Sequence, residues 1–162
     1  MTSEKEPPIR VLFVDDEQEV LQALSRLLRD EDYEVLTAAS GEEGLEILNN
    51  TGNIGVIVSD QTMPVMNGIE FLKRAWELSP DSLRIMLTGQ EGLDLEHEAL
   101  YKAGAFRFIS KPGKNEELIK TLRDAVATYM LIRENRRMTI RLAPKTSEKA
   151  DRHREKTLRA TT

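Results

Sequence analysis

Hydrophobic residues fall along this chain in two patterns, short continuous runs and wider-spaced stripes. The continuous runs are rich in Val, Ile and Leu, which is typical of strands buried on both faces. They lie at residues 9–14, 35–38, 54–59, 83–87 and 105–109. After each run, apolar residues recur every three or four positions, which predicts a helix. The predicted helices lie at residues 20–28, 41–48, 68–78, 94–102 and 115–142.

These elements alternate, strand then helix, five times in about 120 residues. Such alternation is typical of a parallel sheet with helices on both faces, and right-handed crossovers leave few strand orders. The flavodoxin-like order 2-1-3-4-5 fits five strands best. The sequence therefore predicts an α/β fold, with a doubly wound five-stranded parallel sheet and a long C-terminal helix.

The central apolar run, residues 54–59, shows how a strand delivers a polar group. The run stops at Asp60, and a turn and a helix follow. Asp60 is therefore predicted at the carboxyl end of a strand, where ligands bind in an open parallel sheet. In the helix that follows, Trp76 falls on the apolar stripe, so we expect it to pack between the helix and the sheet.

Composition narrows the setting of this fold. The chain contains no cysteine, which excludes disulfides and thiolate metal sites. Its N-terminus is polar and no apolar run approaches the length of a membrane span, so we expect a cytoplasmic protein with no membrane partner. The charge is uneven, because residues 1–132 carry 24 acidic and 13 basic side chains, whereas residues 133–162 carry 4 and 10.

Polar side chains follow four of the five predicted strands. They are Asp15 and Asp16 after the first strand, Asp60 after the third, Thr88 after the fourth and Lys111 after the fifth. In the order 2-1-3-4-5 these four strands are neighbours, so the side chains converge on one edge. Two carboxylates about 4 Å apart repel by about 4 kcal/mol at an effective dielectric of about 20, so the three acids require positive charge.

Lys111 supplies one positive charge, and a divalent cation would supply the rest. Oxygen ligands without His or Cys favour a hard ion, Mg²⁺ or Mn²⁺. A carboxylate, such an ion, a lysine and a hydroxyl are together suited to phosphoryl transfer onto the carboxylate. In that chemistry Asp60 is the nucleophile, the ion and Lys111 offset the charge of the transferred group, and Thr88 donates a hydrogen bond.

The same positions carry a family resemblance. The ordered pattern Asp15-Asp16, Asp60 with Met63-Pro64 and Gly68, Thr88, and Lys111-Pro112 resembles the receiver domain of two-component response regulators. The resemblance covers residues 9–130 as a receiver domain. Outside it we expect a flexible leader (1–8), a helical extension (131–142) and, because almost no apolar residues remain, a disordered basic tail (143–162). This division leaves no recognisable output domain, so the chain is a stand-alone regulator or the receiver part of a longer protein.

The resemblance implies that Asp60 accepts a phosphoryl group from a histidine kinase or a phosphotransfer protein. The protein would then be a phosphoprotein switch and not an enzyme. Asp16 and Asp60 would bind Mg²⁺ directly, together with the backbone carbonyl of Thr62, and Asp15 would bind it through a water.

The resemblance also implies how the switch is transmitted. Thr88 would be the switch hydroxyl, and Lys111 would bind the phosphoryl group. Phe108 holds the position of the switch aromatic residue, which is often Tyr in the family. These residues would change the face formed by helix 94–102, strand 105–109 and helix 115–142, which a protein target or a second copy of the chain would then recognise.

Other functions remain as alternatives. Aspartyl-phosphate hydrolases also use a strand-end Asp, but they usually need a second acid two residues later, where this chain has Thr62. A binding module of flavodoxin type would need a glycine-rich phosphate loop after the first strand, and the sequence has none there. The basic tail is too short for a DNA-binding domain, so we expect no nucleic-acid partner beyond non-specific contact.

The last predicted helix is longer than a receiver domain needs, about 42 Å for residues 115–142. Its apolar stripe has steps of four and three residues, which is typical of a coiled-coil seam. The stripe consists of Leu118, Leu122, Ala125, Tyr129 and Ile132. We expect a homodimer through this helix or through the face defined above, and the alternative is an extension without a partner.

Overall fold

The computed structural model of the chain describes residues 7–89, 93–111 and 114–142. The expected leader, apart from residues 7 and 8, and the whole of the expected tail lie outside the described residues.

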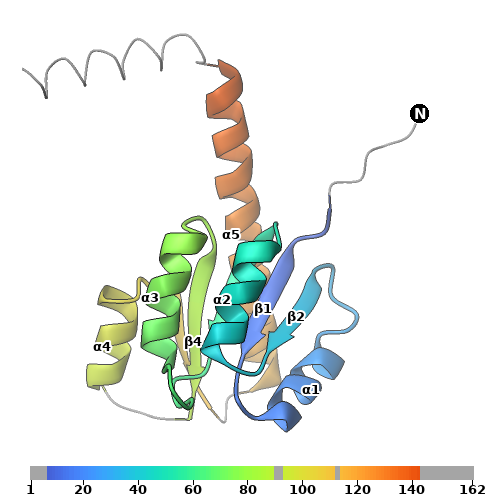
Figure 1. Cartoon of the computed structure of the whole chain (residues 1–162). Helices are drawn as coiled ribbons and strands as arrows, with labels where there is room; N and C mark the ends of the chain where they lie inside the picture. Colours follow the sequence, from blue (N-terminus) through green and yellow to red (C-terminus); the bar gives the residue numbers. More distant parts are fainter. Residues whose placement is uncertain (1–6, 90–92, 112–113, 143–162) are drawn as a thin grey trace, which may run out of the picture. The chain divides into compact units, whose positions relative to one another are not determined.

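Five strands form one parallel sheet in the order β2-β1-β3-β4-β5 (Figure 1). The strands are β1 (Arg10–Val14), β2 (Glu34–Ala38), β3 (Ile54–Ser59), β4 (Leu83–Thr88) and β5 (Arg107–Ser110). The helices are α1 (Gln18–Leu27), α2 (Gly41–Asn50), α3 (Gly68–Leu78), α4 (Leu93–Tyr101) and α5 (Asn115–Leu142). The predicted fold is confirmed, including the long last helix.

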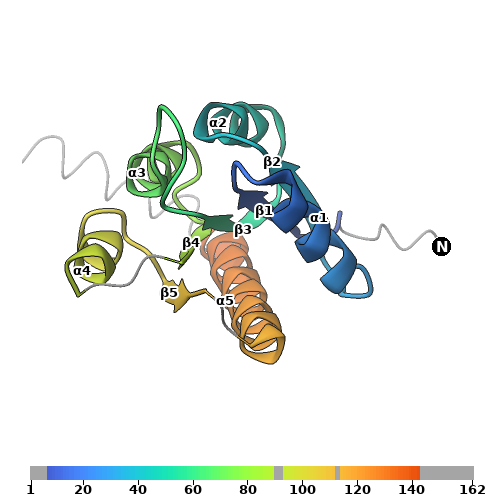
Figure 2. The same cartoon turned by 90° about the horizontal axis from the view of Figure 1, so that it is seen from below.

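Helices cover both faces of the sheet, with α2 and α3 on one side and α1 and α5 on the other (Figure 2). The central strand β3 is buried along its whole length, as expected for a strand between two helical layers. The core under α2, α3 and α4 includes Phe71, Leu72 and Met86, and the core under α1 and α5 includes Phe13 and Leu122. These two layers hold the strands so that the carboxyl ends of β1, β3, β4 and β5 lie along one edge.

The last strand begins at Arg107, two residues later than predicted. The segment before it is hydrogen-bonded to α4, because the Ala105 N–H donates to the Ala99 carbonyl at 2.9 Å and not to the sheet. Gly104 adopts a φ of 61°, in the left-handed region that commonly ends a helix. Ala105 therefore belongs to the connection, and Phe106, whose N–H donates to the Arg84 carbonyl of β4, leads directly into the strand.

Trp76 of α3 does pack against a residue of the sheet, but it is not the buried apolar contact that its place on the stripe suggested. Its side chain is 43% exposed. The guanidinium carbon of Arg84, a β4 residue, lies 4.5 Å from the centre of the indole ring. An arginine side chain takes the position beneath the ring that an apolar side chain would otherwise fill.

The loop from β3 to α3 contains a strained turn. Val65 has a φ of 72° and is 91% exposed. The Met66 N–H donates to the Pro64 carbonyl at 2.8 Å, which closes a three-residue turn around Val65. Met63 and Met66 on either side are buried, so they anchor the loop in the core while its tip reaches solvent.

As far as Tyr129, the apolar stripe of α5 is buried within its own domain. Leu118, Leu122, Ala125 and Tyr129 are buried, so these four positions do not form the exposed seam that their spacing suggested. A four- and three-residue repeat describes any helix side that is covered, and here the sheet covers it. The chain divides after this point into two compact units, Met1–Tyr129 and Met130–Thr162.

The helical residues of the second unit carry several exposed apolar side chains. Met130, Leu131, Met138 and Ile140 are between 49% and 72% exposed. Among the described residues, no helix combines the length and the apolar character needed to cross a membrane.

Candidate functional site

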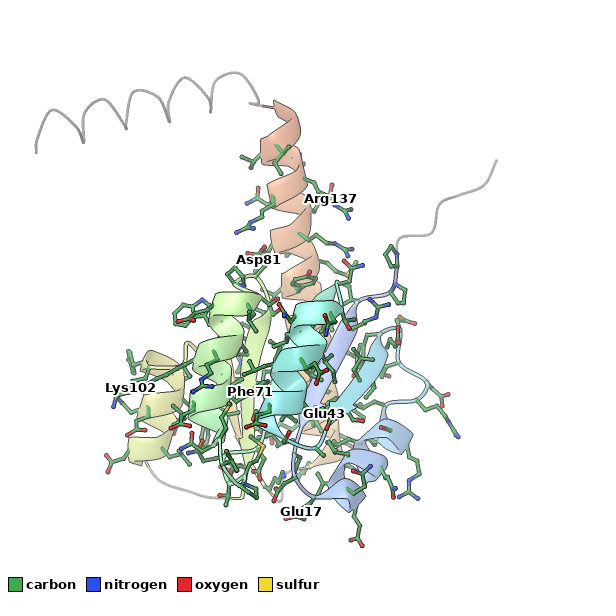
Figure 3. The ribbon with its side chains drawn as sticks, viewed as in Figure 1. Glu17, Glu43, Phe71, Asp81, Lys102 and Arg137 are labelled. Carbon is green, nitrogen blue, oxygen red and sulfur yellow. The ribbon has the colours of Figure 1, made fainter. Side chains whose placement is uncertain are left out.

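Two carboxylates leave the sheet side by side because their strands are neighbours. Asp15 directly follows β1, and Asp60 directly follows β3. The Asp60 N–H donates to the Val14 carbonyl at 3.0 Å, so the ladder between the strands extends into the site. Figure 3 places Glu17, which follows the acidic pair, at this edge of the sheet and Asp81, which precedes β4, at the opposite edge. The backbone positions of Asp15 and Asp60 at the carboxyl edge are therefore fixed by the sheet.

The hydroxyl and the lysine come from the other two strands of this edge. Thr88 is the last residue of β4 and is 1% exposed, and Lys111 directly follows β5. The Lys111 N–H donates to the Thr88 carbonyl at 2.7 Å. This bond holds the two residues together at the point where both strands end.

The predicted side chains meet. Asp15, Asp16 and Asp60 each offer a carboxylate oxygen, and these oxygens lie within 4.8 Å of one another. The Lys111 Nζ lies 3.0 Å from the Asp15 Oδ2 and 3.9 Å from the Asp60 Oδ1. The side chain of Asp15 is 5% exposed and that of Asp60 is 12% exposed, whereas Asp16 lies in solvent. Three acids and one base in this space leave a surplus of negative charge.

Asp15 is held on both of its oxygens. Its Oδ1 accepts the Glu17 N–H at 2.9 Å, and its Oδ2 accepts the Lys111 ammonium. A carboxylate that is buried and bound in this way is fixed in position. Asp60 has a looser ion pair with the same lysine, and one of its oxygens lies within 4.8 Å of oxygens of the other two acids.

Burial raises the pKa of the Asp60 carboxyl above its usual range. The positive charge of Lys111 opposes this rise, and the negative charge of Asp15 adds to it. Hydrogen bonds from the Thr88 hydroxyl and from the Gln61 backbone lower the pKa again. The net rise means that the charged form of Asp60 is held at a cost in free energy, which added positive charge would relieve.

The donor set fits a hard divalent cation. The three acids present only oxygen atoms, and their spacing allows oxygens of all three to approach a common point. Mg²⁺ and Mn²⁺ prefer such ligands, and Mg²⁺ keeps several waters when one or two carboxylates hold it. Thr62, whose backbone carbonyl was expected to join the set, lies on the exposed loop two residues beyond Asp60.

Phe108 lies on β5, opposite Met86 of β4, and is half-buried against the core under α2, α3 and α4. Two residues further along the same two strands, Thr88 lies opposite Ser110. The expected switch residues therefore share one pair of strands and one face of the sheet.

The structure gives roles to two further residues that were not among the predicted site residues. Gln61 ties the loop to α3, because its Oε1 accepts the Ile69 N–H and its backbone carbonyl accepts the Gly68 N–H, both at 3.0 Å. A side chain on Gly68 would collide with the Asp60 carbonyl, so only glycine allows this approach. The second residue is Arg84, and its signal in the sequence is a lone cation inside an apolar run.

The chain is similar to one family over most of its length. The model of the response regulator receiver domain matches residues 11–123. The hydrogenase transcriptional regulatory protein HoxA of Bradyrhizobium diazoefficiens is 36% identical over 124 residues, which are 76% of this chain and 25% of HoxA. The chain thus spans about a quarter of the length of this curated relative.

Solved structures agree with this similarity. A response regulator receiver domain from Clostridium thermocellum is 34% identical and has a TM-score of 0.71, with 76% of this chain and 98% of that chain covered. The chemotaxis protein CheY4 of Vibrio cholerae is 36% identical and has a TM-score of 0.68, with 74% and 99% covered.

Proposed function

Because the chain belongs to the response regulator receiver domain family, a family of phosphorylation-controlled signalling domains, we propose that Asp60 is the residue that accepts the phosphoryl group. One observation supports this assignment above the others. Asp60 is the one acid of this cluster that is partly buried and lies beside both the Lys111 ammonium, at 3.9 Å, and the Thr88 hydroxyl, whereas Lys111 bonds Asp15 more tightly, at 3.0 Å. A carboxylate oxygen that is not held in the tighter pair can form a bond to phosphorus.

The donor is a phosphohistidine of a histidine kinase or phosphotransfer protein. An Asp60 oxygen forms a bond to phosphorus while the phosphorus–nitrogen bond breaks, and the imidazole leaves with the electron pair of that bond. Lys111 and the Thr88 hydroxyl lie beside Asp60 and stabilise the oxygens of the transferred group. The transfer produces an acyl phosphate on the protein's own side chain, so the protein is a substrate and a switch and not an enzyme.

Asp15, Asp16, Asp60 and the Thr62 carbonyl would hold Mg²⁺ or Mn²⁺. The bound ion would supply positive charge against the phosphoryl oxygens. The raised pKa of Asp60 is consistent with this, because burial makes its charged form costly and a bound cation would offset that cost. Thr62 has no carboxyl to serve as a general acid, which disfavours an aspartyl-phosphate hydrolase.

We expect the modification to act through Thr88 and Phe108 on the face formed by α4, β5 and α5. A downstream protein or a second copy then recognises that face, and the cytoplasm is the expected location. The exposed apolar side chains of the second unit favour a second copy of the chain as the binding partner. Leu131 and Met138 lie seven residues apart with Asn135 between them, a spacing that fits two-stranded parallel pairing with one polar position.

Phosphorylation is tested with acetyl phosphate and Mg²⁺, followed by intact-protein mass spectrometry. We expect the wild-type chain and the control Asp30→Asn, an exposed position, to gain one phosphoryl group. Asp60→Asn should gain none. Modification of Asp60→Asn to the wild-type extent would refute the assignment of the acceptor.

Self-association is tested by light scattering with and without beryllofluoride, a mimic of the phosphoryl group. We expect the activated wild type to form a dimer and Leu131→Asn with Met138→Asn to remain monomeric. A wild-type monomer under both conditions would exclude self-pairing and leave the phosphoacceptor unaffected.

A further inference from the structure

Arg84 is a buried cation on an interior strand of the sheet, and its partners are carbonyl groups. It lies on β4 and is 7% exposed. Its Nε donates to the Ala103 carbonyl at 3.1 Å, its Nη1 to the Ser82 carbonyl at 2.9 Å and its Nη2 to the Gly104 carbonyl at 3.1 Å. None of the ion pairs found within the described ranges involves it. Each nitrogen of the guanidinium is thus used to hold backbone.

Two of these carbonyls belong to the turn that ends α4. The last carbonyls of a helix lack partners within the helix and carry its negative dipole end. Ala103 and Gly104 follow the last helical residues, and a cation placed there satisfies both needs at once. Burial lowers the pKa of Arg84, and the carbonyl oxygens compensate for the water that the guanidinium has lost. Lysine could not span three separated carbonyls from a single nitrogen.

Trp76 of α3 covers the guanidinium from outside. The indole ring lies 4.5 Å from the guanidinium carbon, a stacking contact that stabilises a cation. A Cβ on Gly104 would lie 2.8 Å from the indole and 3.0 Å from the guanidinium. The three residues therefore form one packed unit that joins α3, β4 and the end of α4. Lys102, just before this turn, is labelled in Figure 3 on the outer side of α4.

This unit lies directly before β5, the strand that leads to the lysine of the site. β5 has four residues and pairs with β4 alone, so it is an edge strand held by few bonds. The pairing begins where the Phe106 N–H donates to the Arg84 carbonyl, and it ends where the Lys111 N–H donates to the Thr88 carbonyl. The Arg84 main chain accepts the first backbone bond of the pairing, and its side chain holds the two carbonyls just before that bond.

We propose that Arg84, held beneath Trp76, is a positioning residue for Lys111: it sets the register of β5 and so places the lysine ammonium beside Asp15 and Asp60. The inference rests on the proposed function, because it concerns the phosphoryl transfer in which Lys111 takes part. Under this proposal the residues of the site fall into two groups. The acids on β1 and β3 are placed without Arg84, whereas the lysine on β5 depends on it.

The test compares Arg84→Lys with Arg107→Lys in the full chain. Arg107 is the matched control, since it is an exposed arginine on β5 that stacks on Phe106 and donates to the Phe106 carbonyl. Three quantities are measured: the rate of Asp60 phosphorylation by acetyl phosphate, the Mg²⁺ affinity by calorimetry, and hydrogen exchange of the segment 103–111. A shift of about 1 Å in a catalytic group can cost up to about a hundredfold in rate.

We expect Arg84→Lys to lower the phosphorylation rate about tenfold and to speed hydrogen exchange in segment 103–111. It should not lower the Mg²⁺ affinity, because the acids keep their places and the competing ammonium moves away from them. Arg107→Lys should match the wild type in all three. In a Lys111→Met background, Arg84→Lys should cause no further loss of rate, because the group that it positions is gone.

A wild-type rate in Arg84→Lys would overturn the proposal, as would equal losses of rate and Mg²⁺ affinity, or losses that multiply in the double variant. If Arg84→Lys does not fold, Trp76→Ala replaces it, since it keeps every hydrogen bond of Arg84 and removes only its cover. That variant should show a smaller loss of rate with Mg²⁺ affinity unchanged, and a wild-type rate would again overturn the proposal. Failure of the wild type itself to be phosphorylated would instead refute the proposed function.

Discussion

Replacing Asp60 with Asn should stabilise the protein when no divalent ion is present. The charges of the site allow the effect to be estimated. At no more than 4.8 Å, Asp15 repels Asp60 by about 3.5 kcal/mol at a dielectric of about 20, and the exposed Asp16 repels it by about 1 kcal/mol at the dielectric of water. Lys111 at 3.9 Å attracts it by about 4 kcal/mol at a dielectric of about 20.

The pairwise charges nearly cancel, so the burial of the carboxylate decides the sign. Burial is also the largest cause of the raised pKa of Asp60. We therefore expect Asp60→Asn to raise the free energy of unfolding by about 1 to 2 kcal/mol at pH 7 in the presence of a chelator. The side chains are similar in size, so packing changes little.

The pH dependence has a definite sign. An acid whose pKa is higher in the folded protein is destabilising once the pH exceeds its pKa in the unfolded chain, about 3.9 for Asp. The penalty is absent below that value and grows as the pH rises through the folded pKa. The advantage of Asp60→Asn should therefore be full at pH 7 and shrink as the pH falls toward about 4.

Urea unfolding followed by circular dichroism measures both variants with chelator and with Mg²⁺. An ion that binds only the folded state, at about one hundred times its dissociation constant, adds about 2.7 kcal/mol. The wild type should gain this fully and Asp60→Asn much less, so the order of stability should reverse. If Asp60→Asn is less stable than the wild type in chelator, the account of Asp60 as a carboxylate that burial destabilises is wrong.

Three further predictions concern single positions, each measured by urea unfolding. Val65→Asn should raise the free energy of unfolding by about 1 kcal/mol, since Asn adopts the left-handed φ of 72° more readily than Val, and no gain would argue against strain in the turn. Gly68→Ala should lower the free energy of unfolding by about 2 kcal/mol, because the new methyl meets the Asp60 carbonyl. The control Gly89→Ala, in open space, should change it by less than about 0.5 kcal/mol, and equal effects of the two variants would contradict the steric reason. Lys111→Met should lower it by about 2 kcal/mol at pH 7, because a buried carboxylate loses its cation, and a loss that persists at acidic pH would point to packing instead.

The strand-end residues were predictable from the sequence because backbone geometry alone brings them together. Parallel strands end at a common edge, so the side chains that follow them converge once the strand order is known. Asp15, Asp60, Thr88 and Lys111 needed no knowledge of side-chain packing. The apolar runs located the strands, the crossover rule and the flavodoxin-like fold supplied their order, and the distances in the structure agree with that order.

Other features depended on tertiary contacts that a periodic pattern does not encode. Arg84 looks like a flaw in an apolar run, and its carbonyl partners lie about 20 residues away in a turn. Trp76 has the spacing of a core residue, but the arginine takes the place beneath it. The stripe that includes Leu122 and Tyr129 repeats like a coiled-coil seam, and only the structure shows that the sheet already covers it.

The backbone bond between Lys111 and Thr88 ties the ammonium and the hydroxyl of the site to one another, independently of their side chains. Removing the Thr88 hydroxyl deletes a donor but leaves the carbonyl that holds the lysine. A movement of the Thr88 main chain, in contrast, carries Lys111 with it. The Thr88 hydroxyl and the Lys111 ammonium are therefore expected to move together. If the end of β4 moves toward Asp60, the positive charge of Lys111 moves toward Asp60 with it.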